Sequence, residues 1–189
     1  AGWALLSYWK HAFWPFRAAF VYPEWPLGPE SVSFYAPLAA VVLLFLGLWT
    51  LRRRAPWARH SLFALAYHAL FLLPVLGLVD IAYFVVGPVS NHLQYLALMG
   101  PVALIAAALA TLVRRWPVPA GAGVAAAVLA LGIFTHQRAL AFRDDASLWN
   151  AAVEAAPTST FARSQRSLLR LDAGDRKGGL EDLEAASRY

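Results

Sequence analysis

Residues 35–51 read YAPLAAVVLLFLGLWTL and contain no charged side chain. Three further apolar stretches follow this one, at residues 61–79, 93–113 and 118–135. A membrane-spanning helix needs about 20 predominantly apolar residues. The four stretches therefore predict an all-α protein with polytopic membrane helices, about four spans in number.

The composition agrees with a membrane protein. Of 189 residues, 60% are hydrophobic and 14% are charged, and the mean hydropathy is +0.52. Soluble domains are roughly 45–50% apolar and about 25% charged, so neither a disordered chain nor a simple soluble globule is expected. The chain has no cysteine, which excludes disulfide scaffolds, thiolate metal sites and cysteine nucleophiles.

The arginines beside the apolar stretches predict the orientation in the membrane. The loops between the first two and the last two stretches hold Arg52, Arg53, Arg54, Arg59, Arg114 and Arg115. Residues 80–92 contain neither Lys nor Arg. Since cytoplasmic loops carry the excess of basic residues, both arginine loops are expected in the cytoplasm. The C-terminal part then lies on the periplasmic side of the inner (plasma) membrane. The net charge of +5 reflects these loops and does not indicate nucleic-acid binding.

Three regions are expected. Residues 1–30 form an aromatic segment, predicted as an interfacial helix that ends near Trp14-Pro15 and a following loop. Residues 31–143 form the transmembrane helical domain. Residues 144–189 begin a repeat domain of short helices at 146–156, 160–173 and 177–188, with a turn at Gly174. Helix–turn–helix units of this length are typical of tetratricopeptide-type solenoids, so the chain is expected to be a fragment of a longer protein.

Within the repeat domain, apolar residues at helical spacing predict the packing of the last two helices. Leu168 and Leu171 are expected to face Leu180 and Leu183 across the Gly174 turn.

Polar side chains gather at the start of the third stretch. Asn91, His92 and Tyr95 follow Gly87-Pro88, and in a helix starting near Asn91 they share one face. His and Asn donate to phosphate or sugar oxygens, and Tyr stacks on a sugar ring. The alternative is an ordinary interfacial helix start with Tyr95 in the aromatic belt.

Three basic side chains interrupt the aromatic segment: Lys10, His11 and Arg17. Cations among interfacial aromatics lie at headgroup depth, where they can bind a lipid phosphate or reach bulk headgroups. Mid-span His68 is predicted to be a neutral imidazole bonded to a neighbouring helix.

No metal or nucleophile motif is present in the sequence. The histidines lack metal-ligand spacing; they are His11, His60, His68, His92 and His136. No cofactor is expected for this chain, and the sequence identifies no catalytic residue.

Three ordered blocks carry a family resemblance. The first is Tyr8, then residues 13–16 (FWPF), then Tyr22-Pro23. The second is LPVLG at residues 73–77 followed by VSNHLQYL at residues 89–96 and Gly100-Pro101, and the third is Asp144, Leu148-Trp149 and Pro157. In order and spacing these blocks resemble tetratricopeptide-repeat membrane glycosyltransferases of the GT-C superfamily, which are related to the transmembrane-and-tetratricopeptide O-mannosyltransferases. The chain departs from the family at Asn91, where Asp is usual, and at Leu93, where an aromatic residue is usual.

The resemblance implies transfer of a sugar from a polyprenyl-phosphate donor to a protein acceptor held by the repeats. Asn91, His92, Tyr95, Lys10, His11 and Arg17 would then bind the donor's phosphate and sugar. The catalytic carboxylate would lie in an N-terminal half before Ala1. The resemblance leaves open whether the intact enzyme uses a divalent metal. Two alternatives remain: a non-enzymatic membrane-anchored tetratricopeptide scaffold for protein–protein interaction, and a small transporter subunit.

Overall fold

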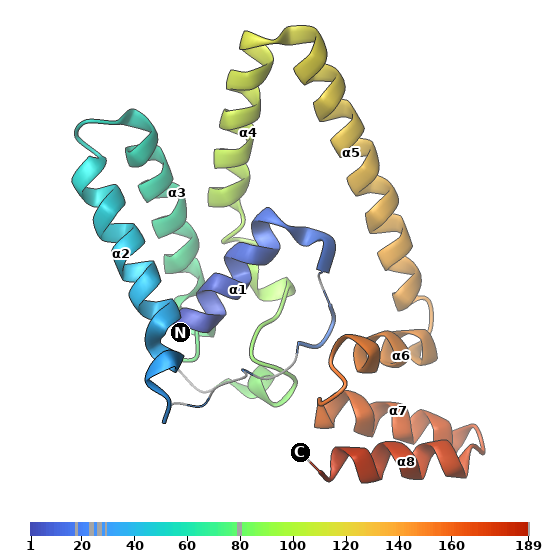
Figure 1. Ribbon diagram of the computed structural model, residues 1–189. Helices are drawn as coiled ribbons and strands as arrows, with labels where there is room; N and C mark the ends of the chain where they lie inside the picture. Colours follow the sequence, from blue (N-terminus) through green and yellow to red (C-terminus); the bar gives the residue numbers. More distant parts are fainter. Residues whose placement is uncertain (18, 23–24, 26–27, 29, 79–80, 189) are drawn as a thin grey trace.

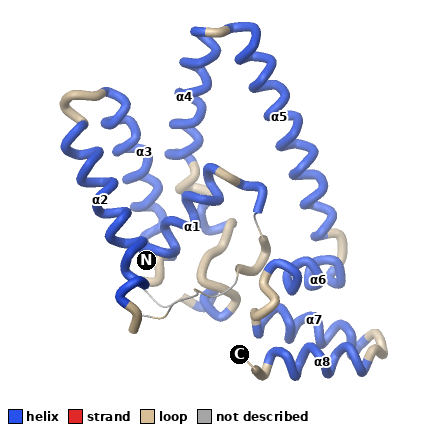
Figure 2. Tube along the Cα trace, viewed as in Figure 1, coloured by secondary structure: helices blue, strands red, loops and turns tan. Residues whose placement is uncertain are grey.

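A computed structural model describes residues 1–189 except 18, 23–24, 26–27, 29, 79–80 and 189. The side chain of Arg17 is not described either. Its described residues form α-helices, short 3-10 turns and loops, with no strand (Figures 1 and 2). The helices are α1 Gly2–Phe13, α2 Ala36–Leu51, α3 Pro56–Leu72, α4 Met99–Arg115, α5 Pro117–Ala139, α6 Asp145–Ala155, α7 Thr160–Asp172 and α8 Arg176–Ala186. The predicted all-α class is confirmed.

Two segments of the described chain have the length and hydropathy to cross a membrane, Val32–Leu51 and Pro117–Phe142. The other two expected spans form helices of 17 residues each, α3 and α4. The third stretch is expected to be helical from residue 93, but α4 begins only at Met99.

Pro101 explains the late start of α4. A proline has no N–H to donate and clashes with the carbonyl four residues earlier, so it is tolerated in the first helical turn and not in the interior. The carbonyl of Ala97, which a residue 101 N–H would otherwise contact, instead accepts a hydrogen bond of 2.9 Å from His68 Nδ1. His68 is completely buried, and its imidazole makes a hydrogen bond as predicted, but the partner Ala97 lies in the turn before α4 and not in a neighbouring helix.

Helix α1 is part of the helical core. It ends at Phe13, directly before Trp14-Pro15 as predicted. Its side chains Ala4, Leu5, Tyr8 and Trp9 are buried with residues of α2 and α3. The Trp9 ring lies 6.1 Å from that of Phe45, centroid to centroid. The aromatic helix is packed against the bundle, and it begins beside the lower part of α2 in Figure 1. Its expected position at the membrane surface stays a prediction.

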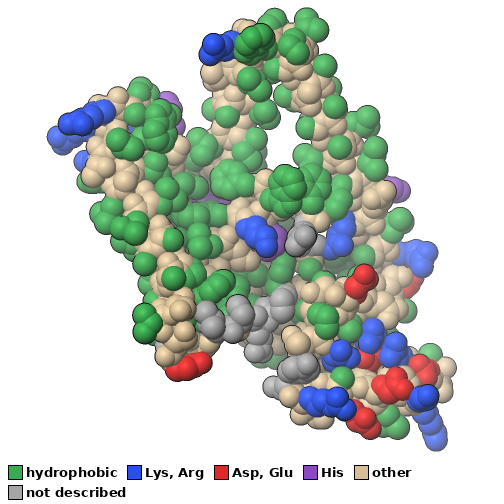
Figure 3. Space-filling view, in the orientation of Figure 1, with side chains coloured by type: hydrophobic (Ala, Val, Ile, Leu, Met, Phe, Trp, Pro, Cys, Tyr) green, Lys and Arg blue, Asp and Glu red, His purple; other side chains and the backbone are tan. Residues whose placement is uncertain are grey.

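Helix α5 stands apart from the bundle. It turns back from α4 at Trp116-Pro117, and the apolar window of its 26-residue segment has no buried residue. Figure 3 shows an opening between α4 and α5. The chain then enters the unit α6–α8, which lies below α5 in Figure 1.

Side-chain caps begin each helix of this unit. Asp144, Ser159 and Asp175 accept hydrogen bonds from the N–H groups of Ser147, Ala162 and Gly178, at 2.7, 3.2 and 2.9 Å. Such caps satisfy N–H groups that have no partner within the helix. Between α7 and α8, Gly174 has φ +84°, as the predicted turn requires. The three predicted helices are confirmed within two residues at each end.

The predicted leucine contact between α7 and α8 is wrong. Leu168, Leu180 and Leu183 are 55%, 54% and 41% exposed. The interface uses small residues instead: Ser167 Oγ donates to the Gly179 carbonyl at 2.8 Å, and a Cβ on Gly179 would lie 2.7 Å from Leu171. Because glycine lets the two backbones approach this closely, Leu171 packs against Gly179, and the other three leucines are left exposed.

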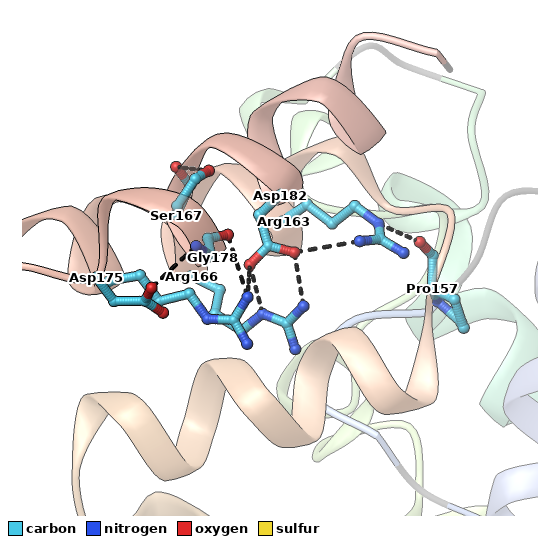
Figure 4. A network of polar contacts seen from close by, with 9 residues as sticks. Pro157, Arg163, Arg166, Ser167, Asp175, Gly178 and Asp182 are labelled. Atoms are coloured by element: carbon cyan, nitrogen blue, oxygen red, sulfur yellow. Dashed lines mark hydrogen bonds and ion pairs between the residues drawn. The ribbon is translucent and has the colours of Figure 1, made fainter.

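A buried carboxylate joins the same two helices (Figure 4). Asp182 of α8 is 1% exposed and accepts hydrogen bonds from three arginines of α7: Arg163 at 3.2 Å, Arg166 at 2.6 and 2.7 Å, and Arg170 at 3.0 Å. Burial opposes ionisation of Asp182, but the hydrogen bonds and charge of Arg166, then Arg170 and Arg163, lower its pKa below the usual value.

Candidate functional site

A short segment, residues 19–22, connects the helical bundle to the α6–α8 unit. The Val21 side chain is fully buried and belongs to the core of that unit, against Ala152, Val153, Ala156 and Ala162. Next to it, Phe20 packs edge-on against Trp149 at 5.6 Å, and Trp149 packs against Phe161 at 5.6 Å. These contacts hold the start of α7 beside the N-terminal part of the chain.

The other side of the segment is held by polar contacts. Tyr22 OH donates to Asn91 Oδ1 at 2.9 Å, and Asn91 Nδ2 donates to the Ala19 carbonyl at 2.9 Å. The Ala19 N–H donates to Tyr22 OH at 3.0 Å. Burial raises the pKa of Tyr22 above its ordinary value, so the hydroxyl keeps its proton and can donate to Asn91.

The adjacent residues Ser90 and His92 extend this network to α1. The Ser90 N–H donates to Tyr8 OH at 3.0 Å, and a hydrogen bond of 2.7 Å joins Ser90 Oγ to His92 Nδ1. The His92 ring packs edge-on against Tyr83 at 5.4 Å and is exposed to solvent. Its second ring nitrogen, Nε2, makes no hydrogen bond to a described residue, so it is free to contact a ligand.

His11 is a second α1 residue, after Tyr8, that reaches the network. Its ring lies 4.7 Å from that of Tyr22. Burial, and then the nearby Lys10 charge, lower the pKa of His11 below its ordinary value. The imidazole is therefore neutral at pH 7 and acts here as a packed side chain rather than a cation.

A cavity of about 330 Å³ lies beside Tyr22, where the bundle meets the α6–α8 unit. Aromatic side chains from distant parts of the sequence line it: Tyr22, Trp25, Phe34, Phe84 and Phe161. Ser159 and Thr160, at the start of α7, complete the wall. The cavity is thus bounded by the segments around the bundle and by the first residues of the repeat-like hairpin.

The structure brings together three of the six predicted donor-binding residues. His11, Asn91 and His92 belong to the network of Tyr8, Tyr22 and Ser90. Asn91, His92 and Tyr95 do not lie on one face of an α-helix as predicted, because residues 92–94 form a 3-10 turn.

The other three lie elsewhere. Tyr95 is 70% exposed and makes no hydrogen bond or ring contact with a described residue. Lys10 is exposed and lines a separate apolar hollow with Trp9, Phe13 and Trp14. The side chain of Arg17 lies outside the described residues.

Acidic and metal-binding groups add nothing to this site in the described part of the chain. Glu30 is exposed, and Glu24 and Asp80, the other two acids of residues 1–143, lie outside the described residues. No group of three or more His, Asp or Glu side chains there could hold a metal ion.

Sequence reasoning missed the residues that build the site. Tyr8 and Tyr22 stand in the aromatic segment, where composition alone predicts interfacial aromatics. Both hydroxyls form hydrogen bonds, as is usual for a buried tyrosine. Val21 carries no sequence signal, because a single valine in an irregular segment has no period.

Comparison with protein-family models, with curated proteins and with solved structures finds no match to this chain.

Proposed function

We propose that this chain is part of an integral-membrane glycosyltransferase, which transfers a sugar from a polyprenyl-phosphate donor to a protein acceptor. The four apolar stretches would span the membrane, with the arginine loops in the cytoplasm and α6–α8 in the periplasm. The proposal draws on the resemblance of the three sequence blocks. The observation that carries it is the aromatic cavity between the bundle and the start of α7.

The location of the cavity suits a reaction between a lipid and a protein. A lipid-linked donor keeps its chain in the bilayer, so its phosphate and sugar lie at the membrane surface. A protein acceptor would be held by the repeats. The two substrates must meet at the boundary between these parts, where Tyr22 and Phe161 share one cavity wall.

The side chains at this boundary suit the donor. Aromatic faces in the cavity wall, such as Trp25 and Phe84, stack on sugar rings. His92 does not line the cavity; it lies next to Asn91, which binds the cavity residue Tyr22, and its free nitrogen can donate to a phosphate oxygen. In the reaction, the acceptor hydroxyl oxygen bonds to the anomeric carbon while the bond from that carbon to the phosphate oxygen breaks. The polyprenyl phosphate leaves, and the hydroxyl proton passes to a general base.

The test is binding of a labelled polyprenyl-phosphate mannose by the chain in lipid nanodiscs. The unchanged chain should bind it more tightly than an ordinary phospholipid, and His92→Ala should weaken binding at least tenfold, which is about 1.4 kcal/mol. His136→Ala is the matched control, since His136 is exposed on α5 and distant in the sequence from the network. Equal binding by the two variants would contradict the assigned role of His92, and no binding by the unchanged chain would contradict the proposed function.

The scaffold alternative is favoured by a different observation. Leu168, Leu180 and Leu183 expose apolar surface on the α7–α8 hairpin, and repeat domains use such faces for neighbouring repeats or protein partners. A chain that captures a protein partner but binds no lipid-linked sugar would support the scaffold over the enzyme.

A further inference from the structure

A long apolar groove runs between α3 and α4, away from the candidate site. Its volume is about 780 Å³. Small side chains of α4 create the space: Ala103, Ala107 and Ala108 face Ala64 and Phe63 of α3. A second apolar hollow of about 570 Å³, toward α1 and α2, shares Trp57, Ser61 and Leu104 with it. Two adjoining grooves of this kind suit two flexible hydrocarbon chains.

The two helices are antiparallel, so the groove has one end near the arginine loops. Just before α4, Ala97 meets His68, and in the first turn of α4 Gly100 meets Ala64, where a Cβ on Gly100 would collide with the Ala64 carbonyl. Further along, Leu104, Ala107 and Thr111 line the groove with residues of the first turns of α3.

That end of the groove is basic and has no acidic partner. Arg59 and His60 line it, and Arg114 and Arg115 follow Thr111 by one helical turn. The described residues give none of these arginines an ion pair. In the sequence, Asp80 is the single acid between Glu30 and Asp144. Figure 3 shows Lys and Arg side chains at the tips of the helices.

We propose that the α3–α4 groove binds an anionic glycerophospholipid of the cytoplasmic leaflet. Its acyl chains lie in the two adjoining hollows, and its phosphate contacts Arg59, His60 and the arginines at the end of α4. Basic pockets between membrane helices on the cytoplasmic side recognise anionic headgroups in this way. A zwitterionic headgroup carries its own positive group, so its net attraction to the unpaired arginines is weaker. The inference rests on the membrane insertion in the proposed function and not on sugar transfer.

The experiment measures lipid binding to the purified, delipidated chain in detergent by native mass spectrometry. Phosphatidylglycerol should bind more tightly than phosphatidylcholine of the same chain length. The double variant Arg59→Gln/Arg114→Gln should lose about 25-fold in affinity for phosphatidylglycerol, since each basic residue near a membrane surface contributes roughly fivefold. The control Arg176→Gln/Lys177→Gln removes the same charge from exposed positions of α8 and should bind as the unchanged chain does.

A groove-filling variant tests the acyl chains. Ala107→Phe should weaken phosphatidylglycerol binding while the helical circular dichroism stays unchanged. Glycerol 3-phosphate should not compete; if it competes as well as the lipid, the site takes a free phosphate and the proposal is overturned. Equal affinity for phosphatidylglycerol and phosphatidylcholine would also overturn it. So would an unchanged preference for phosphatidylglycerol in the Arg59→Gln/Arg114→Gln variant. None of these results depends on binding of a lipid-linked sugar, so the two proposals fail separately.

Discussion

The buried carboxylate of Asp182 offers a sharp test of how the α7–α8 hairpin is held together. Asp182→Asn keeps the size of the side chain but removes the charge that Arg163, Arg166 and Arg170 share. The three arginine side chains are 20%, 17% and 33% exposed, so they are only partly solvated. Removing one partner of a buried ion pair costs about 3–5 kcal/mol, because the remaining charge is left uncompensated.

The loss should be local to the hairpin, which makes amide hydrogen exchange the right assay. Local opening of a helix pair is read directly from the exchange rates of its own amides. A loss of about 3 kcal/mol corresponds to exchange that is more than 100-fold faster in α7 and α8, since about 1.4 kcal/mol is a factor of ten. Amides of α3 should exchange as in the unchanged chain.

Glu181→Gln is the matched control for Asp182→Asn. Glu181 is the preceding residue, is exposed, and has no ion pair with a described residue. Its substitution should change exchange little, because exposed charges contribute about 0–1 kcal/mol. If both variants exchange alike, the assigned role of the Asp182 cluster is wrong.

Acid should destabilise the α7–α8 hairpin by protonating Asp182. Because the folded pKa of Asp182 is lowered, its contribution to stability is complete above the ordinary Asp value of about 3.9 and is lost as the pH falls through the folded value. Protection of α7 and α8 should therefore be constant from about pH 5 to pH 8 and should fall below about pH 4. The Asp182→Asn variant should lack this component of the acid loss.

Three further outcomes are expected. Gly174→Val should lower the free energy of unfolding of the hairpin by about 1 kcal/mol or more, because φ is +84° there; Gly174→Asn, whose side chain tolerates this region, should cost less in the same exchange assay. Asn91→Ala should lower the free energy of unfolding by about 1–3 kcal/mol, since it removes two hydrogen bonds at 2.9 Å. An unchanged melting temperature would contradict the role of the network. Alkaline phosphatase fused after Arg54 or Arg115 should be inactive and after Ser90 active, and activity at either arginine would contradict the proposed topology.

Local signals predicted most of the helices well. The end of α1 before Trp14-Pro15 follows from a proline effect on the preceding residue, and the turn at Gly174 follows from the need for a positive φ. Both depend on one or two neighbouring residues, so the sequence contains all the information that they need. His68 was also predictable, because a buried imidazole needs a hydrogen-bond partner.

The sequence leaves a choice where one pattern allows two readings. The aromatic residues of α1 predict an interfacial helix, and that stays a prediction, while Leu5, Tyr8 and Trp9 also have the spacing of the buried helical face that the structure shows. The leucines of α7 and α8 also have helical spacing, but the glycines of α8 and the arginines of α7 decide which faces meet. Such choices depend on close backbone approach and on buried charge, which no period in the sequence records.

The candidate site could not be assembled from the sequence for a topological reason. Asn91 holds segment 19–22 from a distance of about 70 residues along the chain, and the same segment places Val21 in the core of α6–α8. One irregular segment is therefore fixed on both sides by contacts that only the folded chain makes. Because Tyr22 belongs both to the polar network and to the cavity wall, a change at Asn91 should alter the cavity as well as the stability. The coupling between residues 90–92 and the start of α7 is thus carried by residues 19–22, and any ligand in the cavity would depend on both.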